Sequence, residues 1–95
     1  MKPTLPDGMT VKIFHYRRFD LLDGVAYLTR GEAKNLGIEA PPLSKGGITH
    51  AVVFNGDEIV PNVLGVAECS NRENYSKSKG RSIAVGRAIK QMQEV

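Results

Sequence analysis

The residues best suited to chemistry in this chain are cations that gather near its C-terminal end. Between Asn74 and Gln93 the sequence has no acidic residue and five cations, Lys77, Lys79, Arg81, Arg87 and Lys90. The whole chain has a net charge of +3, so the other residues together are slightly acidic. Such asymmetry indicates an anionic partner that binds at one place.

Arg81 is the most informative of these cations because of its position in a predicted C-terminal helix. Helical periodicity places five apolar side chains on one arc, Ala84, Val85, Ala88, Ile89 and Met92. Arg81 falls on the same arc, where an unpaired buried charge would be very costly. It must therefore pair with a carboxylate such as Glu68 or lie at the rim, facing an anion. Lys77, Lys79 and the Gly80 backbone share this helix start, and helix N-termini attract phosphates.

Two residues that precede the helix have side chains suited to a nucleotide. The amide of Asn74 can read a base edge or a ribose, and the ring of Tyr75 can stack on a base. The structural alternative for Tyr75 is packing onto the helix.

Gly80 and Gly86 are unusual because glycine inside a helix costs about 1 kcal/mol relative to alanine. Either a neighbouring element packs closely against them, or the backbone of a ligand or partner must come near. Ile83 lies on the face opposite the apolar arc. With the two glycines it suggests a homo-oligomer that forms through the helix, which would also supplement the small core of a 95-residue chain.

Catalytic motifs are missing from the sequence. It has no nucleophile elbow, no phosphate-binding loop, no paired carboxylates and no metal-ligand spacing. His15, His50 and Cys69 occur singly, and an isolated strand histidine is usually structural. We therefore expect a binding protein that is not an enzyme and needs no metal or cofactor.

Length and composition predict one domain over residues 1–95. No apolar run approaches the roughly 20 residues that cross a bilayer, and the N-terminus lacks the apolar region of a secretory signal. The single cysteine cannot form an internal disulfide, which suits a reducing compartment. We expect a soluble cytoplasmic protein.

Alternating apolar residues predict strands over residues 10–19, 25–28, 48–54, 58–60 and 63–69. Asn55-Gly56 and Pro61-Asn62 are the predicted turns between the last three. The last strand has a face of small residues, which would let a helix pack closely. Ser76 or Ser78 would cap that helix, which runs to about Gln93.

A short helix is predicted near residues 30–36, between the second and third strands. Thr29 and Glu32 have the spacing of a capping box, and Gly37 would end the helix. The segment 39–47 reads as a loop and, with its lysine, as a candidate ligand flap. The predicted fold class is α+β: a small twisted antiparallel sheet covered by the C-terminal helix.

The run from Gly65 to Lys90 resembles a segment of small phage-encoded proteins. In those, a strand that ends near a Cys leads through an Asp/Asn-aromatic pair into a helix reading Gly-Arg-x-x-Ala-x-Gly-Arg. Here Asn74-Tyr75 matches the pair, and residues 80–87 match the helix motif. The segment is most similar to the first-described anti-Thoeris sponge proteins of phages, over about a quarter of the chain.

That resemblance implies a homo-oligomer that captures a cyclic ADP-ribose-type signal without cleaving it and so blocks host anti-phage immunity. Some members of the family hold cyclic oligonucleotides at a second site within a hexamer. The resemblance also implies the cytoplasm of an infected bacterial host as the location. The resemblance also implies ligand contacts at Asn74, Tyr75, Arg81 and Arg87. With Lys77 and Lys79, these four form the predicted ligand-binding set of Asn74, Tyr75, Lys77, Lys79, Arg81 and Arg87.

Two other functions fit the same sequence. Three strands followed by a helix that opens with Ser76-Lys77-Ser78-Lys79 are similar to the end of a double-stranded RNA-binding domain, whose lysines contact phosphates. The first helix of such a domain is not matched here, because residues 10–19 read as a strand. The third reading is a phage protein that inhibits a host protein by direct docking, through Ile83 and the 39–47 loop.

Overall fold

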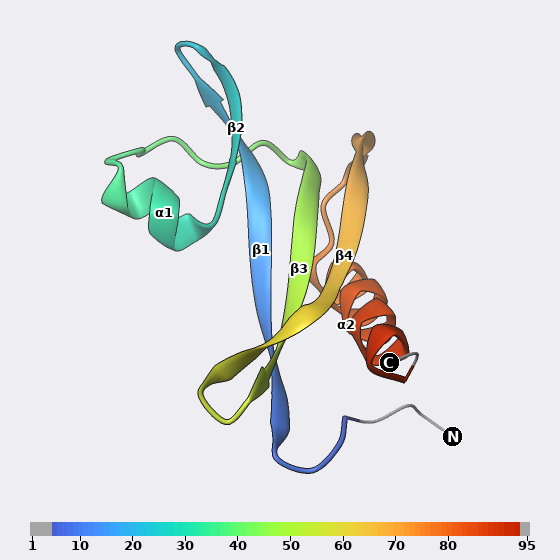
Figure 1. Cartoon of the computed structure of the whole chain (residues 1–95). Helices are drawn as coiled ribbons and strands as arrows, with labels where there is room; N and C mark the ends of the chain where they lie inside the picture. Colours follow the sequence, from blue (N-terminus) through green and yellow to red (C-terminus); the bar gives the residue numbers. More distant parts are fainter. Residues whose placement is uncertain (1–4, 94–95) are drawn as a thin grey trace.

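The computed structural model describes residues 5–93 as a four-stranded antiparallel sheet with two helices. The strand order is β2-β1-β3-β4 (Figure 1). The elements are β1 (Met9–Leu21), β2 (Gly24–Leu28), α1 (Arg30–Asn35), β3 (Lys45–Asn55), β4 (Glu58–Asn74) and α2 (Lys77–Gln93). The predicted α+β class, with a C-terminal helix over the sheet and a short helix near residue 30, is confirmed.

The β1–β2 hairpin and α1 project from the rest of the molecule (Figure 1). Strand β1 continues to Leu21, two residues beyond the prediction, and pairs with β2 from Arg17 onward. The predicted capping box is confirmed, since Thr29 Oγ1 accepts from the Glu32 amide and Glu32 Oε1 accepts from the Thr29 amide. Gly37 follows α1 with a φ of 76°, as expected for a glycine that ends a helix.

The β3–β4 hairpin differs from the prediction at both of its turns. Asn55 pairs with Glu58, so the two-residue turn is Gly56-Asp57 and not Asn55-Gly56. The predicted turn at Pro61-Asn62 is wrong, because β4 continues through it. Asn62 has a φ of 64°, and the β3–β4 register shifts between Val52 and Phe54. The turn-forming residues therefore lie in a bulge of β4, and the chain does not reverse its direction there.

The predicted 39–47 loop is shorter than expected, because its last three residues belong to β3. Gly46 and Gly47 are buried and have φ values of 79° and 143°, which other residues rarely adopt. The remaining loop is tied to the body by backbone bonds: the Leu43 amide donates to Arg18, and the Tyr75 amide donates to Ser44. Lys45 is therefore the first residue of β3, and the loop that was predicted as a ligand flap does not include it.

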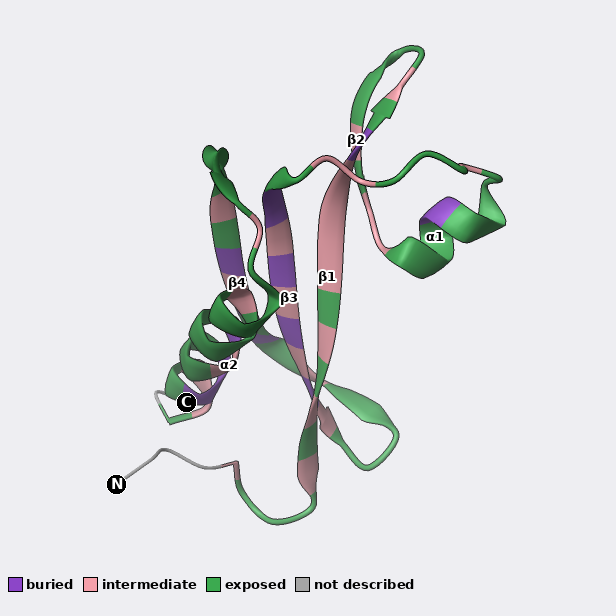
Figure 2. Ribbon diagram, turned by 180° about the vertical axis from the view of Figure 1, so that it is seen from behind, coloured by how far each residue is buried: buried purple, intermediate pink, exposed green. Residues whose placement is uncertain are grey.

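The core lies between α2 and one face of β3 and β4 (Figure 2). Its buried members are small: Ala51, Val53, Val63, Ala67, Ala84 and Ala88. The small-residue face predicted for β4 is confirmed at Gly65, where an added Cβ would lie 1.8 Å from the Ala84 carbonyl oxygen. The backbone of α2 thus rests directly on the sheet, and side chains near its start are held in fixed positions over β3.

Candidate functional site

A three-residue hydrogen-bonded cluster joins the start of α2 to the sheet. The Tyr75 hydroxyl lies 2.7 Å from Nδ1 of His15 on β1 and 2.6 Å from Oγ1 of Thr49 on β3. His15 Nδ1 also lies 3.1 Å from Thr49 Oγ1. When Thr49 donates to Tyr75 and Tyr75 donates to His15 Nδ1, the ring proton of His15 lies on Nε2. Nε2 is buried and has no hydrogen-bond partner among the described residues.

Two glycines create the space that this cluster occupies. At Gly47 an added Cβ would lie 2.3 Å from the Tyr75 ring, and at Gly80 it would lie 2.4 Å from Thr49 Oγ1. The structural explanation of Gly80, close packing against a neighbouring element, is therefore confirmed. The Cβ direction of Gly80 points to the sheet, and the predicted subunit contact through α2 stays a prediction. Gly86 has open space around its Cα, and Ile83 is exposed.

Cations from two elements surround the cluster. The guanidinium of Arg17 lies 4.7 Å from the centre of the Tyr75 ring, in a cation–π contact. Burial, followed by the positive charges of Lys77, Arg81 and Arg17, lowers the pKa of His15 below its ordinary 6.5. Neutral imidazole is therefore the form present at neutral pH.

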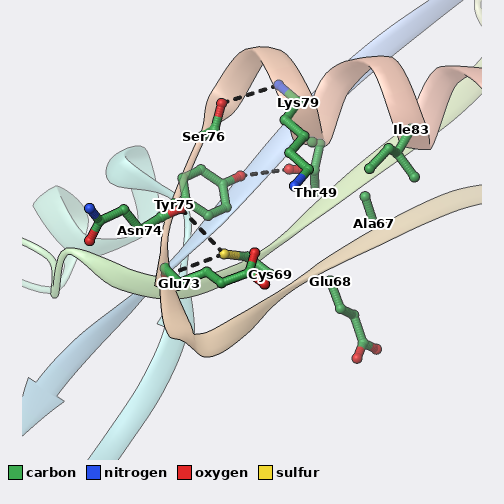
Figure 3. A pocket seen from close by; sticks show the side chains of 11 residues that line it. Thr49, Ala67, Glu68, Cys69, Glu73, Asn74, Tyr75, Ser76, Lys79 and Ile83 are labelled. Atoms are coloured by element: carbon green, nitrogen blue, oxygen red, sulfur yellow. Dashed lines mark hydrogen bonds between the residues drawn. The ribbon is translucent and has the colours of Figure 1, made fainter.

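Arg81 is exposed, close to the start of α2. The side chain of Glu68, the carboxylate suggested as its partner, points away from the helix (Figure 3). Arg81 is therefore not buried on the apolar arc, and its contact with an anion stays a prediction. Burial raises the pKa of Tyr75, so its phenol stays protonated and keeps its hydrogen bonds beside these cations.

A hollow of about 250 Å³ lies beside His15, where β1 passes the starts of both helices. Its lining includes Arg17 of β1, Thr29 and Arg30 at the start of α1, and Lys77 at the start of α2. No acidic residue lines it. Three cations from three elements thus converge on one solvent-accessible space, an arrangement that favours an anion.

A smaller cavity of about 110 Å³ lies on the other side of Tyr75, between β4 and α2 (Figure 3). Asn74, Lys79 and Ile83 line it, together with the Cys69 thiol and Glu73. The thiol lies 3.5 Å from the Glu73 carbonyl oxygen and 3.6 Å from that of Asn74. Glu68 and Glu73 line this cavity as well as Lys79, so it is less suited to a phosphate than the hollow beside His15.

Ser76 is confirmed as the N-cap of α2, because the Lys79 amide donates to its hydroxyl at 3.3 Å. The cap turns the chain from β4 into the helix directly after Tyr75. It thereby fixes Lys77 toward β1 and Lys79 toward β4, on opposite sides of the tyrosine.

Arg87 is the predicted ligand residue that the structure places elsewhere. Its guanidinium donates to the Val66 carbonyl on the free edge of β4. One turn later the Gln91 amide pairs with both the amide and the carbonyl of Leu64, at 2.8 Å each. These two side chains occupy edge groups that would otherwise be open to another strand. Arg87 therefore has a structural contact and lies outside the hollow.

The structure thus gathers four of the other five predicted residues near Tyr75: Asn74, Lys77, Lys79 and Arg81. It adds four that sequence reasoning missed: His15, Arg17, Arg30 and Thr49. The alternation of β1 does place His15 and Arg17 on one face, and this was the available signal. Nothing local in the sequence indicates that the face lies against Tyr75, because the two segments are 60 residues apart.

Within residues 5–93 the structure shows no group of three or more His, Cys, Asp or Glu side chains placed to hold a metal ion. In the same part of the chain, neither helix has the length and apolar character needed to cross a membrane. Comparison of the sequence and structure with protein-family models, curated proteins and solved structures found no match.

Proposed function

We propose that this protein binds a phosphate-bearing nucleotide in the hollow beside His15 and sequesters it without cleavage. The observation that carries the proposal is the convergence of Arg17, Arg30 and Lys77 on one space that no acidic residue lines. Arg81 adds a fourth positive charge close to His15. Charge-assisted hydrogen bonds from such groups to phosphate oxygens are among the stronger polar contacts in proteins.

The geometry gives these residues different roles. Arg30, Lys77 and Arg81 are exposed, so their charged groups are free to turn toward a phosphate. Arg17 is more constrained, because it donates to the Leu43 carbonyl at 3.1 Å and stacks on Tyr75. Tyr75 is therefore proposed as a positioning residue for Arg17, in place of the base-stacking role suggested by its sequence context.

The nucleotide class rests on the resemblance of residues 65–90 to the phage anti-Thoeris sponges. That resemblance favours a cyclic ADP-ribose-type signal or a cyclic oligonucleotide as the ligand, and evasion of host immunity as the purpose. Asn74 and Lys79, which line the adjoining cavity, would contact the parts of the nucleotide that extend past Tyr75. A protein that only sequesters its ligand needs no catalytic group.

The proposal is tested by native mass spectrometry and titration calorimetry with cyclic nucleotides, ADP-ribose derivatives and short RNAs. Arg30→Gln, Lys77→Gln and Arg81→Gln should each weaken binding roughly tenfold or more, since a hydrogen bond to a charged group contributes about 1.5–3 kcal/mol. Lys90→Gln is the matched control, because Lys90 is an exposed cation in the last turn of the same helix. If all three variants fold and bind like the wild type, the site is wrong.

A nucleic-acid backbone is the second ligand that the structure supports, because Lys77 and Lys79 are exposed in the first turn of α2. Salt concentration separates the two ligands. Affinity for a polyanion should fall steeply between about 50 and 200 mM salt, whereas a small nucleotide in a hollow should lose far less. If the protein instead inhibits a host protein by direct docking, a protein partner should remain bound to it during purification and no nucleotide should.

A further inference from the structure

One residue in the lining of the hollow beside His15 can change its charge near neutral pH, and it is His15 itself. Arginine and lysine side chains stay positively charged over the whole range in which histidine titrates. They supply the other charged lining residues, Arg17, Arg30 and Lys77. The remaining lining residues have no group that ionises: Ile13, Phe14 and Thr29. The charge of the hollow therefore depends on pH through His15.

Every charged group that faces His15 is a cation. These cations come from β1, α1 and α2: Arg17, Arg30, Lys77 and Arg81. β3 and the segment that leads into α2 contribute the uncharged hydroxyls of Thr49 and Tyr75. No carboxylate of the described chain lines the hollow. A proton on His15 therefore adds a positive charge to a space that already holds several, and like-charge repulsion disfavours it.

The hydrogen bonds of His15 also fit the neutral ring. Nδ1 of His15 and the hydroxyls of Tyr75 and Thr49 lie within hydrogen-bond distance of one another. With a neutral ring, both hydroxyl protons have acceptors in the cluster, because Thr49 donates to Tyr75 and Tyr75 donates to Nδ1. In the imidazolium ion Nδ1 carries a proton as well. One of the two hydroxyls then has to donate outside the cluster, so the free site favours the neutral form.

Two donors on lining residues are incompletely satisfied by the protein alone. Nε2 of His15 and Nε of Arg17 are buried and have no hydrogen-bond partner among the described residues. Buried polar groups without a partner are uncommon in folded proteins, and each one calls for an explanation. Both of these groups belong to side chains that border the hollow. A negative charge placed in the hollow stabilises their N–H dipoles and the cations beside them.

We propose that an anion enters this hollow together with a proton that His15 takes up. The inference rests on the proposed function, which assigns the anion to the same hollow. A bound anion offsets the surrounding positive charges and attracts an imidazolium ion, so it favours the protonated ring. Because coupling between two ligands is reciprocal, the proton increases the affinity for the anion by the same factor.

The direction of the pH dependence follows from this coupling. In the free protein the pKa of His15 is below 6.5, and the bound anion raises it. Between the two pKa values the complex holds a proton that the free protein does not, so affinity for the anion increases as the pH falls through this interval. Above both values neither state holds the proton, and the affinity does not depend on His15. A site of arginines and lysines alone would bind with constant affinity over the same range.

The first test follows the ring protons of His15 by NMR while the full chain is titrated with acid, in sodium sulfate and in sodium chloride of equal ionic strength. Sulfate is the probe because both of its charges persist over the range in which histidine titrates. The proton dissociation constant of His15 should be roughly tenfold lower in sulfate, a change of one pKa unit. Equal values in the two salts, at every sulfate concentration, would overturn the inference.

His50 is the internal control for this titration. It follows Thr49 on β3, so its side chain points to the other face of the sheet, where its ring lies 4.8 Å from that of Tyr16. Its titration should be the same in both salts. A change of equal size at His50 and His15 would show a general salt effect and would also overturn the inference. The experiment uses the wild type, so it does not depend on the folding of a variant.

The second test counts protons by titration calorimetry with ADP-ribose, whose two phosphates keep their charges in this range. Measurements at a pH of about 6, in buffers of different ionisation enthalpy, give the number of protons taken up per ligand. The wild type should take up a fraction of a proton, whereas His15→Gln, which keeps all the cations, should take up none. Equal uptake by the two proteins would assign the proton to another group and reject the role of His15.

The two proposals fail separately. If ADP-ribose binds to the wild type without proton uptake, the coupling is wrong and the proposed function stands. If sulfate lowers the proton dissociation constant of His15 but no nucleotide binds, the hollow is a proton-linked anion site and the nucleotide assignment is wrong.

Discussion

The hydroxyl of Tyr75 lies 2.7 Å from Nδ1 of His15, which bonds the segment that leads into α2 to a strand 60 residues earlier. The same hydroxyl lies 2.6 Å from Thr49 Oγ1. This contact fixes where α2 begins relative to β1, and hence where the cations of its first turns lie.

Tyr75→Phe should destabilise the protein by about 1–2 kcal/mol, because the variant removes the hydroxyl shared by two partly or fully buried polar side chains. Urea denaturation measures this loss. Tyr27→Phe is the control, since Tyr27 is an exposed tyrosine on β2. Equal stabilities for the two variants would mean that the Tyr75 hydrogen bonds contribute nothing to folding.

His15 should make the stability depend on pH. Its pKa in the folded protein is below 6.5, so between these two values the unfolded chain binds a proton that the folded chain does not. The stabilisation is complete above pH 6.5 and decreases as the pH falls toward the folded pKa. Urea denaturation at several pH values should show a steeper loss for the wild type than for His15→Gln. Parallel curves would contradict the prediction, because carboxylate titration is common to both proteins.

Arg81→Gln and Lys77→Gln should each raise the pKa of His15, because the positive charges of both residues lower it in the wild type. The chemical shifts of the His15 ring protons, followed by NMR during a pH titration, report this value directly. Lys90→Gln should leave it unchanged, since that cation is in the last turn of α2. If Arg81→Gln leaves the pKa of His15 unchanged, Arg81 does not lie close to His15.

Two glycine substitutions should act in opposite directions. Gly65→Ala should destabilise the protein by about 3 kcal/mol or more, because the new methyl group would overlap the Ala84 carbonyl and push α2 off the sheet. Gly86→Ala should stabilise it by about 0.5–1 kcal/mol, because position 86 is helical with open space around it. Thermal unfolding of both variants provides the comparison, and a stable Gly65→Ala protein would refute the close contact.

The sequence by itself determined the features that depend on near neighbours. Alternation identified β1 and β3, and the capping box with Gly37 located α1. The apolar arc of α2 and the small face of β4 correctly predicted which surfaces meet. Each of these features follows from spacing within a few residues, where backbone geometry fixes the direction of side chains.

Turn signals were less reliable, because strand pairing can override them. Pro61-Asn62 has the composition of a turn, but β4 pairs with β3 on both sides of it, and a bulge that includes Asn62 keeps the strand intact. Asn55-Gly56 predicted the hairpin correctly and placed its turn one residue early.

Only the tertiary structure decided which residues form the candidate site. In the folded chain His15 and Thr49 contact Tyr75, and Arg30 lines the same hollow as Lys77. Arg87 instead contacts the edge of β4. The physical reason is that all these contacts join separate elements. Their geometry depends on strand register and on how closely Gly65 and Gly80 let α2 approach the sheet, and no local pattern of residues encodes that distance.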